Sequence, residues 1–198
     1  MRHSIKALIA QSVDEVIRHH YPTRFYSLCH VYAILGSNLI SIIGRENFRP
    51  VAGLAAIDCG QGSIMRMADN SAFARPEGGA YHCWIESVDG PAAERQLVDL
   101  TFRHNHIYAE QNGHPWHRAA PPDFLWALKR DAVFECALAE LPANFPDGQM
   151  WLAETEEGAA WLQRQLAEHQ NALVVLTAEA LSRCSAELLK SECTFNEI

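Results

Sequence analysis

Long apolar runs are missing from this chain. Nowhere in its 198 residues do apolar side chains continue for the ~18 positions that a membrane-spanning helix requires. Near the amino-terminal end, the stretch Ala7–Ala10 is bounded by polar residues and is too short for the core of a signal peptide. The pattern argues against a membrane or exported protein. We therefore expect a cytoplasmic location and no membrane contact.

Paired cysteines are missing as well. None of the six cysteines belongs to a Cys-x-x-Cys motif, and their spacing is not that of a small disulfide scaffold; they stand at positions 29, 59, 83, 136, 184 and 193. For a chain of this size without an export signal, free thiols are the expectation. Five of them, all except Cys29, are expected to be buried and inert.

Positive charge is scarce. The chain has 16 Lys and Arg against 24 Asp and Glu, so its formal net charge is −8. Such a balance argues against a general affinity for the nucleic-acid backbone, and we expect no nucleic-acid partner. Internal repeats, low-complexity stretches and linkers are also missing. With 48% apolar and 20% charged residues, the composition is that of one globular domain spanning residues 1–198.

Hydrophobic periodicity predicts two helices before any strand. Residues 4–20 carry apolar side chains at helical spacing, and Pro22 follows them. A second helix is predicted over residues 27–43, with Ser27 as its N-cap and Gly44 just beyond its last turn.

A block of strands then precedes further helices. The predicted strands are 51–57, 63–68, 79–86 and 96–102, and the turn around Gly90 joins the last two as a hairpin. Helices are predicted at 123–140, 156–169 and 177–190, with Thr155 as an N-cap. Residues 150–153 and 173–176 fit either a short strand or a buried helix. This order predicts an α+β fold with an antiparallel sheet.

Cys29 lies where a thiol becomes reactive. The first turn of a helix has unpaired N–H groups and the positive end of the helix dipole, and both stabilise a thiolate. The helical face of Cys29, Ala33 and Gly36 has small side chains, so another element can approach the sulfur closely.

The predicted hairpin supplies partners for Cys29. Alternation along its first strand places His82, Trp84 and Glu86 on one face. If the hairpin centres near Gly90, Asp99 falls opposite His82, where a carboxylate would orient the imidazole. Trp84 is expected to pack in the core and Glu86 to lie at a solvated strand end.

These segments resemble a known family. The cysteine that opens a helix, the His82-x-Trp84 strand and Asp99 on the next strand are similar to the transglutaminase-like branch of the papain-like cysteine peptidase superfamily. The resemblance covers residues 25–103. It implies a papain/transglutaminase-like fold with the nucleophile helix packed on the antiparallel sheet. A helical C-terminal portion is expected over residues 120–198.

The resemblance also implies a function. A triad of Cys29, His82 and Asp99 would hydrolyse an amide or ester through a thioester on Cys29, without a cofactor or metal, on a peptide or small amide substrate. The backbone N–H of Cys29 or a side chain within residues 21–26 could stabilise the oxyanion. Acyl transfer by the same triad and a catalytically silent binding module remain alternatives. The oligomeric state is not determined by the sequence.

A histidine-rich stretch suggests a further alternative. His104, His106, His114 and His117 lie close together in the sequence, and histidines at such spacing can bind zinc. A metal-dependent hydrolase using this stretch is therefore possible. No cysteine or second histidine pair completes the usual ligand spacing, so we expect these histidines not to converge on one metal.

Overall fold

The fold is built around an antiparallel sheet with helices packed against it. The computed structural model describes residues 1–74, 80–146 and 148–195, with the backbone alone at 70 and 191–195. Within these residues the sheet has six strands in the order β2-β1-β3-β4-β5, and β6 pairs with β1. The strands are β1 Phe48–Gly60, β2 Ser63–Met67, β3 His82–Ser87, β4 Gln96–Asp99, β5 Leu125–Leu128 and β6 Trp151–Glu154. Each of these pairs is antiparallel, which confirms the α+β class.

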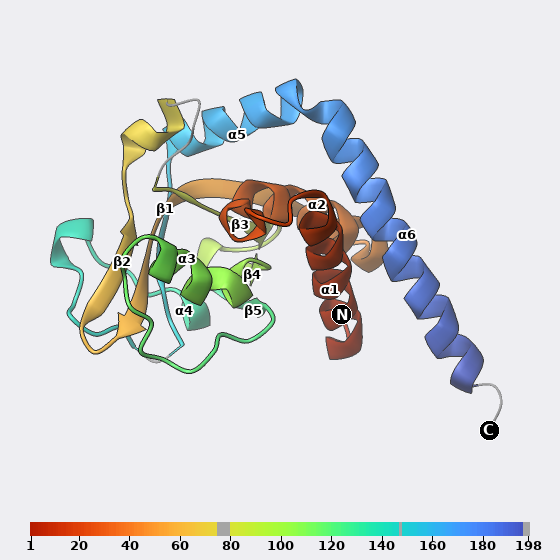
Figure 1. Cartoon of the computed structure of the whole chain (residues 1–198), viewed down its shortest axis with the longest axis horizontal. Coiled ribbons are helices and arrows are strands. Elements are labelled where there is room, and N and C mark those ends of the chain that lie inside the picture. Colours follow the sequence, from red (N-terminus) through yellow and green to blue (C-terminus); the bar gives the residue numbers. More distant parts are fainter. Residues whose placement is uncertain (75–79, 147, 196–198) are drawn as a thin grey trace.

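The helices lie mainly along one side of the sheet (Figure 1). Their bounds are α1 His3–His20, α2 Cys29–Gly44, α3 Asn105–Gln111, α4 Lys129–Ala132, α5 Glu156–Glu168 and α6 Gln170–Phe195. In Figure 1, α2 crosses the middle of the molecule, and the long α6 runs beside α1 and α2. The helix predicted over 4–20 is confirmed. The next one begins two residues later than predicted, at Cys29.

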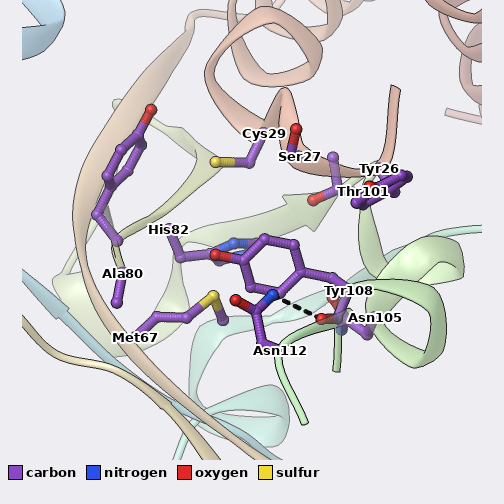
Figure 2. Close-up of a pocket in the computed structure, with 11 residues that line it drawn as sticks. Tyr26, Ser27, Cys29, Met67, Ala80, His82, Thr101, Asn105, Tyr108 and Asn112 are labelled. Carbon is purple, nitrogen blue, oxygen red and sulfur yellow. Dashed lines mark hydrogen bonds between the residues drawn. The ribbon is translucent and has the colours of Figure 1, made fainter. Parts of the chain in front are cut away.

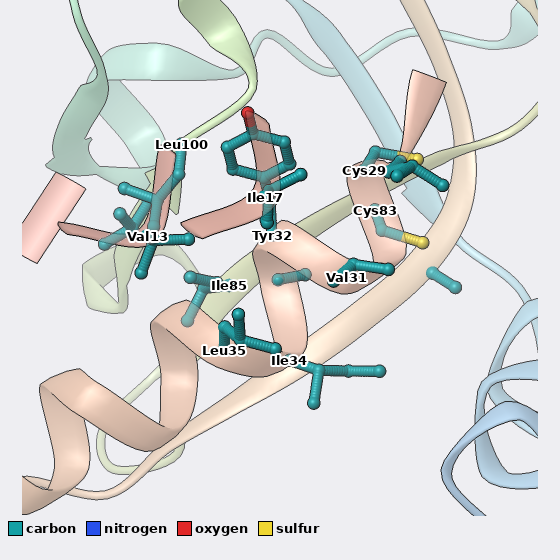
Figure 3. Close-up of a cluster of buried hydrophobic side chains, with 14 of the residues drawn as sticks. Val13, Ile17, Cys29, Val31, Tyr32, Ile34, Leu35, Cys83, Ile85 and Leu100 are labelled. Carbon is teal, nitrogen blue, oxygen red and sulfur yellow. The ribbon is translucent and has the colours of Figure 1, made fainter. Parts of the chain in front are cut away.

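Helix α2 is the central helix of the core. Ten of its sixteen residues are buried, and its side chains pack between α1 and the strand β3 (Figure 3). Its small face allows this approach: a Cβ at Gly36 would lie 2.6 Å from both Ile85 and Leu100. Replacing Gly36 would force these side chains away. The predicted close approach of a strand to the small helix face is therefore confirmed.

The opposite face of the sheet is also covered. Val51, Ala55, Trp84 and Leu97 belong to a second buried cluster. Because both faces of β1 are packed, this long strand is buried along nearly its whole length. Strand β3 therefore lies in the middle of a rigid sheet, and its first residue, His82, is held at the end of that sheet.

The helix predicted over residues 123–140 is wrong. The segment instead forms β5, the one-turn helix α4 and a 3-10 turn at Leu138–Glu140. Spacing of apolar residues in a short segment fits a strand as well as a helix. The edge of β4 makes this segment a strand, because β5 completes the backbone hydrogen bonds of β4. A side-chain bond adds to the pairing: Trp126 Nε1 donates to Gln96 Oε1 at 2.8 Å.

The C-terminal portion is only partly helical. Residues 151–154 form β6, so the expectation of a helical portion over the whole of 120–198 is wrong. From 156 onward it holds: Thr155 caps α5 by accepting from Gly158 N at 3.1 Å, as predicted. Residues 173–176 belong to α6, which is longer than the predicted helix 177–190. Among the described residues, no helix combines the length and the apolarity that crossing a bilayer demands.

Candidate functional site

Cys29 is the first residue of α2. Leu28 is the N-cap and its carbonyl accepts from the N–H groups of Val31 and Tyr32 at 2.9 and 3.1 Å. The predicted cap is wrong: the Ser27 hydroxyl donates to Arg24 O instead. In the described part of the chain, the Cys29 N–H donates to no backbone carbonyl. A free donor therefore lies directly beside the sulfur.

His82 and Asp99 form a buried hydrogen-bonded pair. His82 Nε2 lies 2.9 Å from Asp99 Oδ2, and only 3% of His82 and 1% of Asp99 are exposed. The other carboxylate oxygen accepts from the backbone N–H and the hydroxyl of Thr101, at 2.8 and 2.7 Å. Asp99 is thus held from two sides. This arrangement leaves Nδ1 of His82 for another partner.

The register of the hairpin differs from the predicted one. Ile85 pairs with Val98 and Glu86 with Leu97, so continuing the ladder would bring Asp99 beside Trp84 rather than His82. His82 and Asp99 therefore meet diagonally across the two strands. A diagonal pair is within reach of long side chains. The predicted contact forms, but through a register shifted by two residues.

The surroundings of Cys29 favour its thiolate. The largest influence is contact with the Cys83 thiol, which lowers the pKa of Cys29 by donating to the sulfur. Burial opposes this shift, but His30 and His82 lower the pKa further, and the net result lies well below the ordinary value. The burial and the sulfur contact correspondingly raise the pKa of Cys83. Cys29 is therefore the thiol of this pair that ionises.

His82 is held in its charged form. Burial alone would lower its pKa, but the Asp99 carboxylate and the Cys29 sulfur together raise the pKa of His82 to about 10. A lowered thiol pKa beside a raised imidazole pKa describes a thiolate–imidazolium pair. Such a pair can attack a carbonyl carbon and then supply a proton to the leaving group.

A cavity of about 360 Å³ opens onto Cys29 and His82 (Figure 2). Its lining carries neither a carboxylate nor a lysine or arginine among the described residues; it consists of Tyr26, Ser27, Cys29, Met67, Ala80, Tyr81, His82, Thr101, Asn105, Tyr108 and Asn112. Tyrosine, asparagine and hydroxyl side chains dominate. The cavity can therefore accept an uncharged polar group.

Glu86 does not lie at a solvated strand end. It is fully buried, accepts from Trp84 Nε1 at 2.8 Å and pairs with Lys129 Nζ at 2.6 Å. The burial of Trp84 confirms the predicted core position. Its ring is stacked with His82 at a centroid distance of 6.3 Å. Trp84 and Glu86 therefore form a packed layer behind His82. Lys129, the first residue of α4 after β5, neutralises the buried carboxylate of Glu86.

The histidine-rich stretch is divided among separate environments. His104 bonds to Asp14 and Tyr32 in the interior, whereas the ring of His106 lies against Trp116. The backbone of His117 bonds to Cys59. Among the described residues, no three His, Cys, Asp or Glu side chains gather in a way that could hold a metal ion.

The remaining cysteines are mostly core residues. Cys59, Cys83 and Cys184 are buried free thiols, and Cys136 is a partly exposed one. The prediction for Cys193 lies outside the described side chains.

Three contributors to the site were missed by sequence reasoning. Cys83 and His30 act on the thiol, and Thr101 holds Asp99. The Asp-x-Thr spacing is a local signal for the third, since a carboxylate commonly accepts from the residue two positions on. Cys83 gave no such signal, because neighbours on a strand normally face opposite sides.

Comparisons with known proteins define the fold alone. No family model matches the chain, and a search of curated proteins found no match. A solved structure described as "The crystal structure of genomics APC5867" is similar, with a TM-score of 0.59 and 15% sequence identity. The alignment covers 92% of this chain and 79% of that one. The two chains therefore share an architecture across nearly the whole of this protein.

Proposed function

We propose that this protein is a thiol-dependent hydrolase of amide or ester bonds, with Cys29 as nucleophile, His82 as base and acid, and Asp99 as the residue that orients His82. The proposed scaffold is that of the transglutaminase-like branch of the papain-like superfamily. The carrying observation is that one cavity holds a thiol of lowered pKa beside an imidazole whose far nitrogen bonds a buried carboxylate. The three side chains come from helix α2 and strands β3 and β4.

The reaction proceeds in two halves. The Cys29 thiolate forms a bond to the carbonyl carbon, and the carbon–leaving-group bond then breaks as His82 donates its proton to the leaving amine. His82 next accepts a proton from water, which attacks the thioester and releases the acid. Asp99 keeps Nε2 of His82 occupied, so Nδ1 faces the sulfur throughout.

The cavity supports an uncharged substrate. A charged group would lose its hydration there and would meet, among the described lining side chains, no charge besides the Cys29 thiolate and the His82 imidazolium, which already pair with each other. A peptide or a small amide meets hydrogen-bonding groups on several sides. Such substrates are the ones we expect the enzyme to accept.

Other functions are less well supported by these features. Acyl transfer would use the same thioester with an amine in place of water. A silent binding module has no need of a lowered thiol pKa, so the surroundings of Cys29 favour chemistry.

The test is trapping of the acyl-enzyme. Wild-type protein is mixed with p-nitrophenyl acetate, and we expect a burst of p-nitrophenolate equal to the enzyme concentration, with acetyl found on Cys29 by peptide mapping. Cys29→Ser should give no burst, and Cys59→Ala, which removes another buried thiol, should keep it. Adding a primary amine then separates transfer from hydrolysis by the product formed. Acetyl spread over several cysteines, or absent from all of them, would contradict the proposal.

A further inference from the structure

We propose that the hydroxyl of Tyr108 is a donor of the oxyanion hole, which it forms together with the backbone N–H of Cys29. This inference rests on the proposed function, because an oxyanion arises only if Cys29 attacks a carbonyl. It assigns a catalytic residue to α3, outside the Cys29–His82–Asp99 triad. It also replaces the expectation that a side chain within residues 21–26 supplies this donor.

One face of α3 forms a wall of the cavity. Asn105 and Tyr108 lie three residues apart on α3, which places them on the same side of the helix. Asn112 follows the last residue of α3, and all three line the cavity. In Figure 2 the ring of Tyr108 extends from α3 into the cavity. Its hydroxyl lies toward His82 and Cys29. The phenol thus points to the region where a carbonyl under attack would lie.

The position of Tyr108 is fixed from both ends of α3. Asn112 Nδ2 donates to the backbone carbonyl of Tyr108 at 2.7 Å. At the other end, His104 lies 3.1 Å from the hydroxyl of Tyr32, which belongs to the same helix as Cys29. Because α3 is connected in this way to α2, the phenol is held relative to the nucleophile. An oxyanion hole depends on such preorganised donors.

Tyr108 keeps the phenol proton that a hydrogen bond to the oxyanion requires. Burial and the negative charge of Cys29 raise the pKa of Tyr108 to about 12. The phenol is therefore neutral near pH 7 and carries the proton that it needs to donate.

Two other tyrosines line the cavity, and their surroundings suit the role of oxyanion donor less well than those of Tyr108. In Figure 2, the ring of Tyr26 lies beyond Ser27 and Thr101 as seen from Cys29. Tyr81 also lines the cavity, and burial and Cys29 raise its pKa as well, but its ring packs against Trp161 with centroids 4.6 Å apart.

The electron flow is that of ordinary acyl transfer. A sulfur lone pair of Cys29 forms the bond to carbon, and the carbonyl π pair moves onto oxygen. Tyr108 and the Cys29 N–H donate hydrogen bonds to that oxygen without losing their protons. When the pair returns, the leaving group departs with its bonding electrons and, if it is an amine, receives the proton of His82.

The experiment compares two reactions of the same thiol. Acylation by p-nitrophenyl acetate passes through an oxyanion, whereas alkylation by iodoacetamide displaces iodide and forms none. We expect Tyr108→Phe to slow acylation by about 100-fold, the usual loss for one oxyanion-hole donor, with KM little changed. Alkylation of Cys29 should keep its wild-type rate, which also shows that the site is folded. Tyr21→Phe, a tyrosine outside this cavity, serves as the matched control and should keep both rates.

The outcomes separate the two proposals. If the wild type acylates Cys29 and Tyr108→Phe does so equally fast, the inference fails while the proposed function stands. The same holds if Tyr81→Phe shows the loss in place of Tyr108→Phe. If both reactions slow together, Tyr108 supports the thiolate rather than the oxyanion, which also overturns the inference. A wild type that forms no acyl-enzyme overturns both proposals.

Discussion

Among the described residues, two histidine–carboxylate pairs are buried, and His82 of the first pair lines the cavity at Cys29. His82 lies 2.9 Å from Asp99, and His104 lies 2.8 Å from Asp14. All four residues are at most 5% exposed. By distance and burial alone, the two pairs cannot be told apart.

Their remaining neighbours make the difference. Beside His82 are the Cys29 sulfur and the open cavity. Around Asp14, by contrast, Tyr32 donates at 2.6 Å and Arg103 at 3.0 Å, and the ring of Phe25 lies against His104. The second pair is therefore enclosed by a phenol, a guanidinium and an aromatic ring. If the proposed function is right, what sets the first pair apart is the thiol and the cavity beside it.

The second pair also has a position that suits a structural role. Asp14 comes from α1, Tyr32 from α2 and His104 from the turn before α3, so the pair joins three segments of the chain. We infer that its contribution is to stability, whereas that of the first pair is to chemistry. The following variants test this division, from the largest expected effect to the smallest.

Cys29→Ala should remove acylation almost completely. Loss of a nucleophile typically costs ~10⁴-fold or more in rate. Because the side chain is small and the packing around it is kept, the variant should unfold near the wild-type denaturant concentration. Stopped-flow acylation and urea unfolding measure the two effects, and Cys184→Ala is the control for loss of a buried thiol. Substantial acylation remaining in Cys29→Ala would show that the reactive group lies elsewhere.

Asp14→Asn should destabilise the fold. The largest single effect on Asp14, burial, raises its pKa, but His104, Tyr32 and Arg103 outweigh it and lower the pKa to about 2 from 3.8. A lowered carboxyl pKa contributes stability above the unfolded value, and this is lost as the pH falls toward 2. The expected contribution at pH 7 is about 2 kcal/mol.

Urea unfolding at pH 7 and at pH 2.5 measures the stability of Asp14→Asn. The difference from wild type should shrink at the lower pH, and Glu15→Gln, on the exposed neighbouring residue, should change little. Cys29 labelling in the folded Asp14→Asn protein should match wild type. Lost labelling with unchanged stability would mean that the second pair acts on the chemistry.

His82→Ala should slow iodoacetamide labelling of Cys29 at pH 6 by at least about tenfold, equivalent to about one pKa unit of thiolate stabilisation. The imidazolium that favours the sulfur anion is then missing. His104→Ala, which breaks the other pair, should keep the labelling rate while lowering stability. Circular dichroism checks that both variants are folded. Equal labelling in wild type and His82→Ala would remove the reason for regarding the first pair as catalytic.

Asp99→Asn should have the smallest effect on labelling, because the imidazole remains in place. Its clearer signature is in the pH dependence of acylation by an amide substrate, whose amine leaving group must take the proton of His82. Asp99 helps to raise the pKa of His82 to about 10, so the rate should fall at alkaline pH as His82 loses its proton. Without the carboxylate that fall should occur at lower pH. If the acylation rate falls at the same alkaline pH in Asp99→Asn as in wild type, Asp99 does not act through His82.

Local patterns in the sequence were sufficient for much of the fold. The helical periodicity near the amino-terminal end, the small face at Gly36 and the cap at Thr155 each depend on neighbours a few positions away, and each is present in the structure. The contact of His82 with Asp99 was also predictable, since the two residues lie on adjacent strands joined by a short connection. The segment 123–140 was not predictable in this way, because the free edge of β4 determined that it became a strand.

The candidate site likewise has features that depend on local sequence and features that depend on tertiary packing. The sequence by itself determined the residue types, the helix start that carries the thiol and the hairpin that carries its partners, because these are local consequences of periodicity and turns. Only the tertiary structure brought Cys83 against the thiol, joined Asp14 to His104 and turned Tyr108 into the cavity. Those contacts join segments far apart in the chain, and such contacts depend on how the elements pack rather than on any pattern within one of them.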